Sequence, residues 1–419
     1  MSRALILGCF LFAILLVFLF LKTDNSFVVS VDQGLPLNNP GVSLSVPETP
    51  PLPASPTVPK SSDIEKQKPL ANPPALVKAV YLTSWSAAAP SKLNYLIDLI
   101  KKTELNAAVI DIKDYSGYVV YNIKNAEVEK YGARQIRIPK INFLIKRLHD
   151  QGIYVIGRLT VFQDPVLAKA RPDLAVKDSA TAKTWLDRKG LAWIDPAAKE
   201  AWDYNIAIAK DALERGFDEI NFDYIRFPSD GDLSRMAFPF YDSQTPKSEI
   251  IKEFFKYLRE RTIGSKISAD LFGLSTVRND DLGIGQIIED AYAYFDFVCP
   301  MVYPSHYAPN FLGYKNPAQY PYEVVGYSMK GAAGRLKNYL GKQEAAKEEE
   351  PETGGEKQAA ESQGQAKLRP WLQDFDLGAN YDALLVRLEI KAVEENSADG
   401  WMLWNPENSY TGQALNPEN

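Results

Sequence analysis

The stretch 218–228 reads DEINFDYIRFP and predicts a buried β-strand, because β-branched and aromatic residues fill a short run that proline closes. Before it, residues 197–215 carry apolar side chains at helical spacing, and Gly216 ends that pattern. A second helical pattern follows at 247–261. A strand between two helices of this length predicts a βα unit of a parallel sheet.

The same alternation extends along the chain in both directions. Strand-like runs also lie at 77–85, 106–114, 154–162, 266–273, 295–304, 368–376 and 399–405, with helical patterns at 91–103, 141–151, 282–292, 323–339 and 381–396. Eight strands with seven helices between them fit a closed α/β structure, the (β/α)8 TIM barrel. A doubly wound open sheet is the alternative, but no strand is followed by the glycine-rich motifs GxGxxG or GxxxxGK[ST].

The composition excludes several classes of protein. Of 419 residues, 47 are Lys or Arg and 53 are Asp or Glu, which gives a net charge of −6 and argues against nucleic acid as a partner. Two cysteines, Cys9 and Cys299, cannot form a disulfide framework. His149 and His306 are the only histidines, too few for the usual zinc site. The residues therefore predict a protein that requires no metal or other cofactor.

The N-terminal segment, 1–24, predicts a membrane anchor. Arg3 precedes an unbroken apolar run from Ala4 to Leu21, which Lys22 closes, and no cleavage signal of small residues follows. Eighteen apolar residues reach the lower end of what spans a bilayer. We therefore expect an uncleaved signal-anchor that holds the rest of the chain on the extracytoplasmic side of a bacterial membrane, at the cell surface or in the periplasm.

The composition then divides the remaining chain. Prolines are dense from about 33 to 75, which forbids helix and sheet pairing, so we expect a stiff, disordered linker at 25–75. The barrel domain is predicted at 76–419. Within it, residues 342–366 are too polar and charged to pack, which predicts a low-complexity surface insertion. The barrel itself is expected to be monomeric.

In such barrels the catalytic groups lie where the strands end. The predicted strand ends carry carboxylates, arginines and aromatic rings but little histidine, which suits a sugar, because aromatic faces stack on pyranose rings and two carboxyl groups can cleave a glycosidic bond. The candidate residues for contact with a polysaccharide or oligosaccharide substrate are Asp111, Asp114, Arg158, Tyr224, Arg226, Tyr303, His306, Asp374 and Trp404.

Strand alternation selects the catalytic pair from the carboxylates. Asn221 and Asp223 share one face of the fourth strand, and Ser268 and Asp270 share one face of the fifth. We expect Asp223 to be the nucleophile or charge stabiliser and Asp270 to be the general acid/base. Arg226 and Arg158 are both natural partners for a neighbouring Asp, and we expect Arg226 to hold Asp223 ionised. The alternative is a structural Asp223–Arg226 pair. Retaining and inverting mechanisms differ in carboxylate separation, which the sequence leaves open.

From 77 to about 406 the chain resembles DUF4015, a family of glycoside hydrolase-like domains of bacterial surface proteins. The likeness rests on the blocks KAVYLT (78–83), VIDIKD (109–114), FDYIRFP (222–228), MVYP (301–304) and GWMLW (400–404). The FDYIRFP block is the most specific of them. The resemblance implies a TIM barrel and hydrolysis of a polysaccharide.

A more distant similarity is to the barrels of glycoside hydrolase family 18. Their fourth strand ends Asp-x-x-Asp-x-Asp-x-Glu, in which the glutamate is the acid. The corresponding residues here are Asp218, Asn221, Asp223 and Ile225, so the acid is missing and a family 18 mechanism is not expected. Two functions stay open: a membrane-anchored glycoside hydrolase acting on an envelope or extracellular polysaccharide, and a catalytically inactive glycan-binding barrel at the cell surface.

Overall fold

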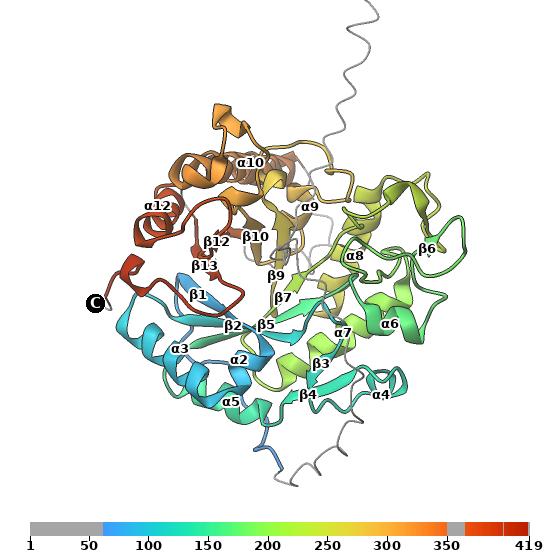
Figure 1. Ribbon diagram of the computed structural model, residues 1–419, viewed down its shortest axis with the longest axis horizontal. Helices are drawn as coiled ribbons and strands as arrows, with labels where there is room; N and C mark the ends of the chain where they lie inside the picture. The colour runs from blue at the N-terminus through green and yellow to red at the C-terminus, as the bar shows by residue number, and fades with distance from the viewer. Residues whose placement is uncertain (1–61, 350–364, 397, 418–419) are drawn as a thin grey trace, which may run out of the picture. The chain divides into compact units, whose positions relative to one another are not determined.

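The computed structural model describes residues 62–349, 365–396 and 398–417. Within these ranges, parallel strands form a closed ring inside a layer of helices (Figure 1). In order around the ring they are β1 (Val77–Leu82), β2 (Ala107–Lys113), β5 (Tyr154–Thr160), β7 (Glu219–Asp223), β9 (Lys266–Phe272), β10 (Phe297–Met301), β12 (Trp371–Gln373) and β13 (Gly400–Trp404). Strand β1 pairs with both β2 and β13, which closes the sheet. The predicted TIM barrel is confirmed.

The outer layer contains the predicted helices. These are α3 (Pro90–Lys102), α5 (Ile141–His149), α7 (Lys199–Glu214), α8 (Lys247–Arg261), α9 (Ile288–Tyr292), α10 (Pro321–Glu349) and α12 (Ala383–Glu394). Helix α9 begins six residues after its predicted start at 282. Gly283 and Gly285 precede it with positive φ angles of 70° and 84°, which a helix cannot contain.

Shorter elements decorate the loops. They are α2 (Ser84–Ala88), β3 (Val119–Tyr121), α4 (Ala126–Lys130), β4 (Arg134–Ile138), α6 (Pro165–Ala170), β6 (Lys177–Asp178), β8 (Met236–Ala237) and β11 (Lys367–Leu368), with 3-10 turns at Leu233–Arg235, Gly273–Thr276, Pro304–His306, Phe311–Gly313, Pro317–Gln319 and Gly412–Ala414. Strands β3 and β4 extend the sheet beyond β2, and β6 pairs with β8. Several of these elements lie in loops after the barrel strands.

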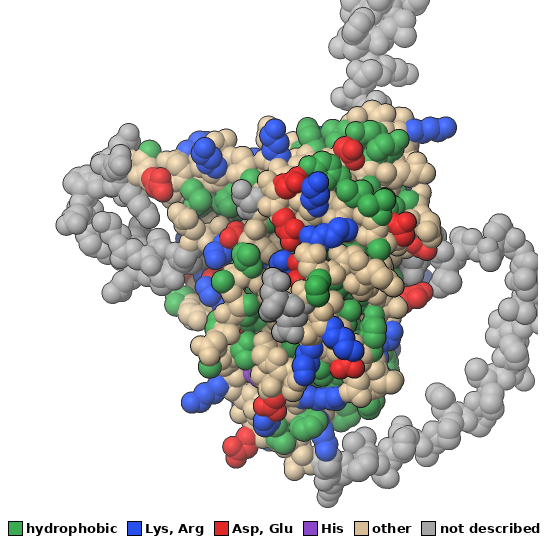
Figure 2. Space-filling view, turned by 90° about the vertical axis from the view of Figure 1, so that its left-hand side faces the viewer, with side chains coloured by type: hydrophobic (Ala, Val, Ile, Leu, Met, Phe, Trp, Pro, Cys, Tyr) green, Lys and Arg blue, Asp and Glu red, His purple; other side chains and the backbone are tan. Residues whose placement is uncertain are grey.

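Two apolar layers hold the barrel together. Inside the ring, small and medium side chains such as Ala79, Val109 and Met402 are fully buried. Between the ring and the helices lie larger ones, including Phe222 and Phe254. Burial of each such Val, Met or Phe contributes about 1.5–3 kcal/mol. On the exterior, acidic and basic side chains are interspersed over the side of the barrel that Figure 2 shows.

The folded part begins before the predicted boundary at 76. Leu70 donates its backbone N–H to Asp218, and Gln67 donates its own to the carbonyl of Arg215. Asp63 accepts hydrogen bonds from the backbone N–H groups of Asn142 and Phe143 at the start of α5. The segment 62–70 forms no helix or strand, as proline-rich sequence predicts, but it is attached to the barrel by side-chain and backbone hydrogen bonds.

Two other predicted segments lie wholly or partly outside the described residues. The predicted insertion at 342–366 begins as helix, because α10 continues to Glu349, and residues 350–364 are outside the described ranges. The predicted anchor at 1–24 and most of the linker also lie outside them. Among the helices that the structure describes, none combines the length and the apolar character needed to cross a membrane.

Candidate active site

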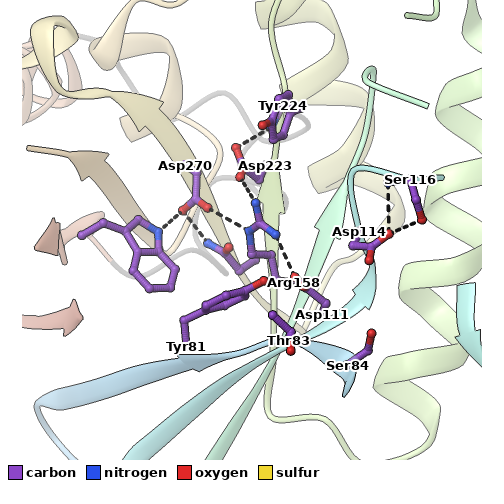
Figure 3. Close-up of polar contacts among 12 residues, drawn as sticks. Tyr81, Thr83, Ser84, Asp111, Asp114, Ser116, Arg158, Asp223, Tyr224 and Asp270 are labelled. Atoms are coloured by element: carbon purple, nitrogen blue, oxygen red, sulfur yellow. Dashed lines mark hydrogen bonds and ion pairs between the residues drawn. The ribbon is translucent and has the colours of Figure 1, made fainter. Parts of the chain in front are cut away.

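Arg158 stands at the centre of the site, on the inward face of β5 (Figure 3). Its Nη1 lies 2.7 Å from Oδ1 of Asp111 on β2, and its Nη2 donates to Oδ2 of Asp223 at the end of β7. Its Nε lies 3.9 Å from Oδ2 of Asp270 on β9. All four side chains are at most 5% exposed. One guanidinium therefore gathers three carboxylates from three barrel strands.

Asp223 owes its position to an abrupt turn of the backbone. The next residue, Tyr224, has a left-handed φ of 53°, a conformation that costs a non-glycine residue about 1–3 kcal/mol. The turn ends β7 and brings the backbone N–H of Tyr224 2.6 Å from Oδ1 of Asp223. It also interrupts strand alternation, so that Asp223, Tyr224 and Arg226 all line the same cavity.

The surroundings of Asp270 act on its pKa in opposite directions. Its Oδ1 accepts hydrogen bonds from Nδ2 of Asn221 at 2.8 Å and from Nε1 of Trp371 at 2.7 Å. Burial, and next the charge of Asp223, raises the pKa of Asp270 well above its usual value, although Arg158 opposes the shift. The two hydrogen bonds to Oδ1 favour the ionised form and lower the pKa of Asp270, but burial has the larger effect.

Asp111 supports Arg158 from behind. Its Oδ2 accepts a hydrogen bond from the hydroxyl of Tyr81 at 2.5 Å, and its Oδ1 pairs with Arg158. Burial raises the pKa of Asp111 to about 6, with Arg158 lowering it and Asp114 raising it. Asp111 does not line the cavity. Its two contacts are instead with the guanidinium of Arg158 and the hydroxyl of Tyr81.

A cavity of about 520 Å³ opens above these charges. Its walls include stacked aromatic rings: the centroids of Tyr81 and Trp404 lie 3.9 Å apart with 16° between the planes, and Trp371 meets both edge-on. Its volume lies within the range of small-molecule binding sites. An aromatic wall beside paired carboxylates is suited to a sugar ring.

The structure brings most of the predicted residues together. Those that line the cavity are Arg158, Asp223, Tyr224, Arg226, Asp270, Tyr303, His306 and Trp404. Asp111, Asp114 and Asp374 do not line it. Asp114 pairs with Arg137 and Ser116 to one side of the Arg158 cluster (Figure 3), and Asp374 accepts two hydrogen bonds from Thr411. Their predicted contact with substrate has no support in this geometry.

The predicted ion pair between Asp223 and Arg226 is wrong. The cation within ion-pair distance of Asp223 is Arg158. Arg226 instead donates through Nη1 to the carbonyl of Phe227 at 3.0 Å and to Oγ of Ser229 at 3.1 Å. In a regular strand, residues three apart point to opposite faces. The left-handed turn at Tyr224 brings both side chains to the cavity but leaves them beyond ion-pair distance.

Other residues of the site were not among the candidates. Tyr81, Gln163, Asp187, Asp230 and Trp371 all line the cavity. Strand parity offered a signal for Tyr81, which follows Ala79 on the inward face of β1. Asp187 and Asp230 come from irregular loops after β5 and β7, where no periodicity points inward. No cluster of three or more His, Cys, Asp or Glu among the described side chains is arranged to hold a metal ion.

Comparisons with known proteins give one family and a shared fold. The model of DUF4015, described as "Putative glycosyl hydrolase domain", matches residues 79–410, which include the whole Arg158 cluster. No curated protein matches the chain.

The solved structures that are similar to this chain include the following three. The glycoside hydrolase domain of PgaB (BpsB) from Bordetella bronchiseptica is 14% identical, with 82% of this chain and 100% of that chain covered and a TM-score of 0.54, a likeness of fold alone. A hypothetical protein from Ruminiclostridium thermocellum ATCC 27405 is 42% identical over 49% of this chain and 98% of its own, with a TM-score of 0.43. The glycoside hydrolase domain of PelA from Pseudomonas aeruginosa is 11% identical, covering 80% and 97%, with a TM-score of 0.42.

Proposed function

The chain belongs to the DUF4015 family of glycosyl hydrolase domains, and from this premise we propose that its barrel cleaves glycosidic bonds with Asp223 and Asp270. The observation that carries the proposal is the Arg158 cluster, in which two carboxyl groups on neighbouring strands differ in their contacts. Both are buried, but Asp223 is ion-paired with Arg158, whereas burial and the charge of Asp223 raise the pKa of Asp270 well above its usual value. A charged and a proton-bearing carboxyl group in one cavity are the two parts that glycoside hydrolysis needs.

The chemistry follows from these two states. Asp270 donates its proton to the glycosidic oxygen as the bond from that oxygen to the anomeric carbon breaks. Asp223 attacks the anomeric carbon or stabilises its developing positive charge. Water then supplies the hydroxyl of the product and returns a proton to Asp270, which restores both carboxyl groups. The rings of Tyr81, Trp371 and Trp404 lie beside the reacting sugar and keep bulk water from it.

The test is turnover by the purified chain on a panel of bacterial and plant polysaccharides. New reducing ends measure hydrolysis, and proton NMR of the first anomer formed distinguishes retention from inversion. Hydrolysis that Asp223→Asn and Asp270→Asn both reduce supports the proposal. Wild-type protein that binds a glycan of the panel and never cleaves it contradicts the proposal.

One observation favours the second candidate, a barrel that binds glycan without cleaving it. Both oxygens of Asp223 already accept a hydrogen bond, from Arg158 and from the backbone of Tyr224. Such a carboxylate can serve to hold the site in shape. Each oxygen still has a second lone pair, and for this reason we place hydrolysis first.

The proposal also includes the subcellular localisation of the protein. The apolar run from Ala4 to Leu21 lies outside the described residues, and its length and flanking charges support an anchor. We propose that this anchor holds a monomeric barrel on the extracytoplasmic side of the membrane. Resistance of the full chain to alkaline extraction, with digestion by protease added to intact spheroplasts, tests both statements.

A further inference from the structure

Arg226 presents an unused hydrogen-bonding edge to the cavity. A guanidinium has five N–H donors, and here Nη1 uses its two on Phe227 and Ser229. Among the described residues, no acceptor contacts Nε or Nη2, and no carboxylate lies within ion-pair distance of Arg226. The side chain is only 4% exposed and lines the cavity.

Aromatic rings fix the orientation of this edge. The guanidinium carbon lies 4.8 Å from the centroid of Trp193, 5.2 Å from that of Tyr224 and 4.6 Å from that of Phe272. These contacts stabilise the charge through the ring faces. They supply no acceptor for the N–H groups that lie in the plane of the guanidinium. A buried cation with open donors is costly until a ligand completes it.

The acidic neighbours of Arg226 do not fill this role. Asp187 has both oxygens occupied: Oδ2 accepts from Gln163 and Trp193 at 3.0 Å each, and Oδ1 accepts from two backbone N–H groups. Burial, and next the charge of Asp187, raises the pKa of Asp230. Asp223, whose charge also acts on Arg226, is itself hydrogen-bonded to Arg158 and to the backbone N–H of Tyr224.

We propose that the open edge of Arg226 binds an anionic group on the substrate sugar, either the carboxylate of a uronic acid or a phosphate ester. The Nε and Nη2 donors form the side of the guanidinium that matches two oxygens of one acid group. The inference deepens the proposed function and rests on it, because it names the substrate as an acidic glycan.

The charge of the chain makes this proposal easy to test. The net charge is −6, so the chain as a whole repels a polyanion at long range. Acidic and basic side chains are also interspersed on the visible side of the barrel (Figure 2). Tight binding of an acidic glycan must therefore come from a local site.

The experiment compares matched polymers by affinity electrophoresis of the full chain. Polygalacturonate and hyaluronan are run beside their carboxyl-reduced forms, and a phosphomannan beside its dephosphorylated form. We expect at least one acidic polymer to be bound about tenfold or more tightly than its neutral form, the effect of hydrogen bonds to a charged group. The pair that shows the difference identifies carboxylate or phosphate.

Variants assign the preference to one residue. Arg226→Gln should abolish the preference for the acidic polymer. Arg226→Lys keeps the positive charge but not the paired N–H donors of the guanidinium, so it should retain a reduced preference. This second variant also provides a test if Arg226→Gln fails to fold. Arg235→Gln is the matched control, because Arg235 pairs with Asp178 outside the cavity. Equal affinity for both members of every pair, or a preference that survives in Arg226→Gln, overturns the inference.

The same polymers are assayed for cleavage, which separates the two proposals. An acidic glycan that is bound through Arg226 and never cleaved leaves the inference standing and contradicts hydrolysis. A neutral glycan that is cleaved without any acidic preference contradicts the inference alone.

Discussion

Asp223 and Asp270 share the guanidinium of Arg158 but contact it unequally. Asp223 receives a direct hydrogen bond from Nη2, whereas Oδ2 of Asp270 lies 3.9 Å from Nε. The ion pair with Arg158 offsets the cost of burying the charge of Asp223 more than that of Asp270. The negative charge of Asp223 then raises the pKa of Asp270. The protonation of Asp270 therefore depends on the charge of Asp223.

Asp223→Asn should abolish turnover without unfolding the barrel. The amide keeps the shape of the carboxylate and loses its charge, so we expect kcat to fall by at least about 10²–10³-fold, the scale of removing one group that stabilises transition-state charge. Reducing-end release measures kcat, and thermal melting measures stability. An unfolded variant would instead assign Asp223 a structural role and favour the glycan-binding barrel.

Arg158→Met should destabilise the fold strongly. Removal of the cation leaves three buried carboxylates without their shared partner, and breaking a buried ion pair from one side costs about 3–5 kcal/mol. Urea denaturation gives the change in the free energy of unfolding. The control is Lys199→Ala, which breaks the exposed pair with Glu253 and should cost about 0–1 kcal/mol. Equal effects of the two variants would contradict this account.

The sequence predicted the barrel strands because each is a short apolar run with clear ends. It predicted the meeting of Asp223 and Asp270 for a related reason: β7 and β9 are neighbours, and Asn221 and Ser268 hydrogen-bond at 3.0 Å on the inward face. Alternation holds along both strands up to Asp223. Where a strand is regular, parity alone therefore locates an active-site residue.

Parity failed where the backbone is irregular. The register of β2 against β5 shifts between Asp111 and Lys113, so that Asp111 faces Arg158 whereas Lys113 pairs with Asp164. Asp114 then lies beside the cavity and outside its lining. At Tyr224 the left-handed turn has the opposite consequence, because it brings Arg226 into the cavity lining together with Asp223. No sequence pattern predicts either the bulge in β2 or a positive φ angle at a tyrosine.

The free energy of unfolding should depend on pH through the titration of Asp111. Burial raises its pKa in the folded protein from 3.8 to about 6, so between about pH 4 and pH 6 the folded state binds a proton that the unfolded state has released. Stability from this group is therefore present below pH 4 and is lost as the pH rises to 6. The unfolding free energy of the wild type minus that of Asp111→Asn should fall by about 3 kcal/mol over this interval.

Urea titrations at half-unit steps from pH 4 to pH 7 give this difference. Asp98→Asn, which removes an exposed carboxylate on α3, supplies the reference curve. A difference between wild type and Asp111→Asn that is constant or rises with pH would refute the assignment.

Asp63 should stabilise the barrel although it lies in the proline-rich segment. Helix α5 has no capping side chain at Lys140, and Asp63 accepts from the second and third backbone N–H groups of the helix, at 2.7 Å and 3.1 Å. Asp63→Ala should cost about 0.5–2 kcal/mol, as loss of a helix N-cap does. Chemical denaturation measures it, with the exposed Glu65→Ala as control. No loss of stability would show that the cap is unimportant.

Asp270→Asn should separate substrates by their leaving groups. The wild-type residue supplies a proton to the glycosidic oxygen, so its loss should reduce kcat on a natural glycan by about 10²–10⁴-fold. An aryl glycoside with an acidic phenol needs little protonation and should be cleaved at nearly the wild-type rate in the step that releases phenol.

Because Asp270 acts in its protonated form, wild-type activity should fall as the pH rises through its raised pKa, and this alkaline limb should vanish in Asp270→Asn. Asp374→Asn is the matched control, a buried acid after β12 that Thr411 holds outside the cavity. Equal losses on both kinds of substrate, with the alkaline limb intact, would remove Asp270 as the acid, and Asp230 in the same cavity would be tested next.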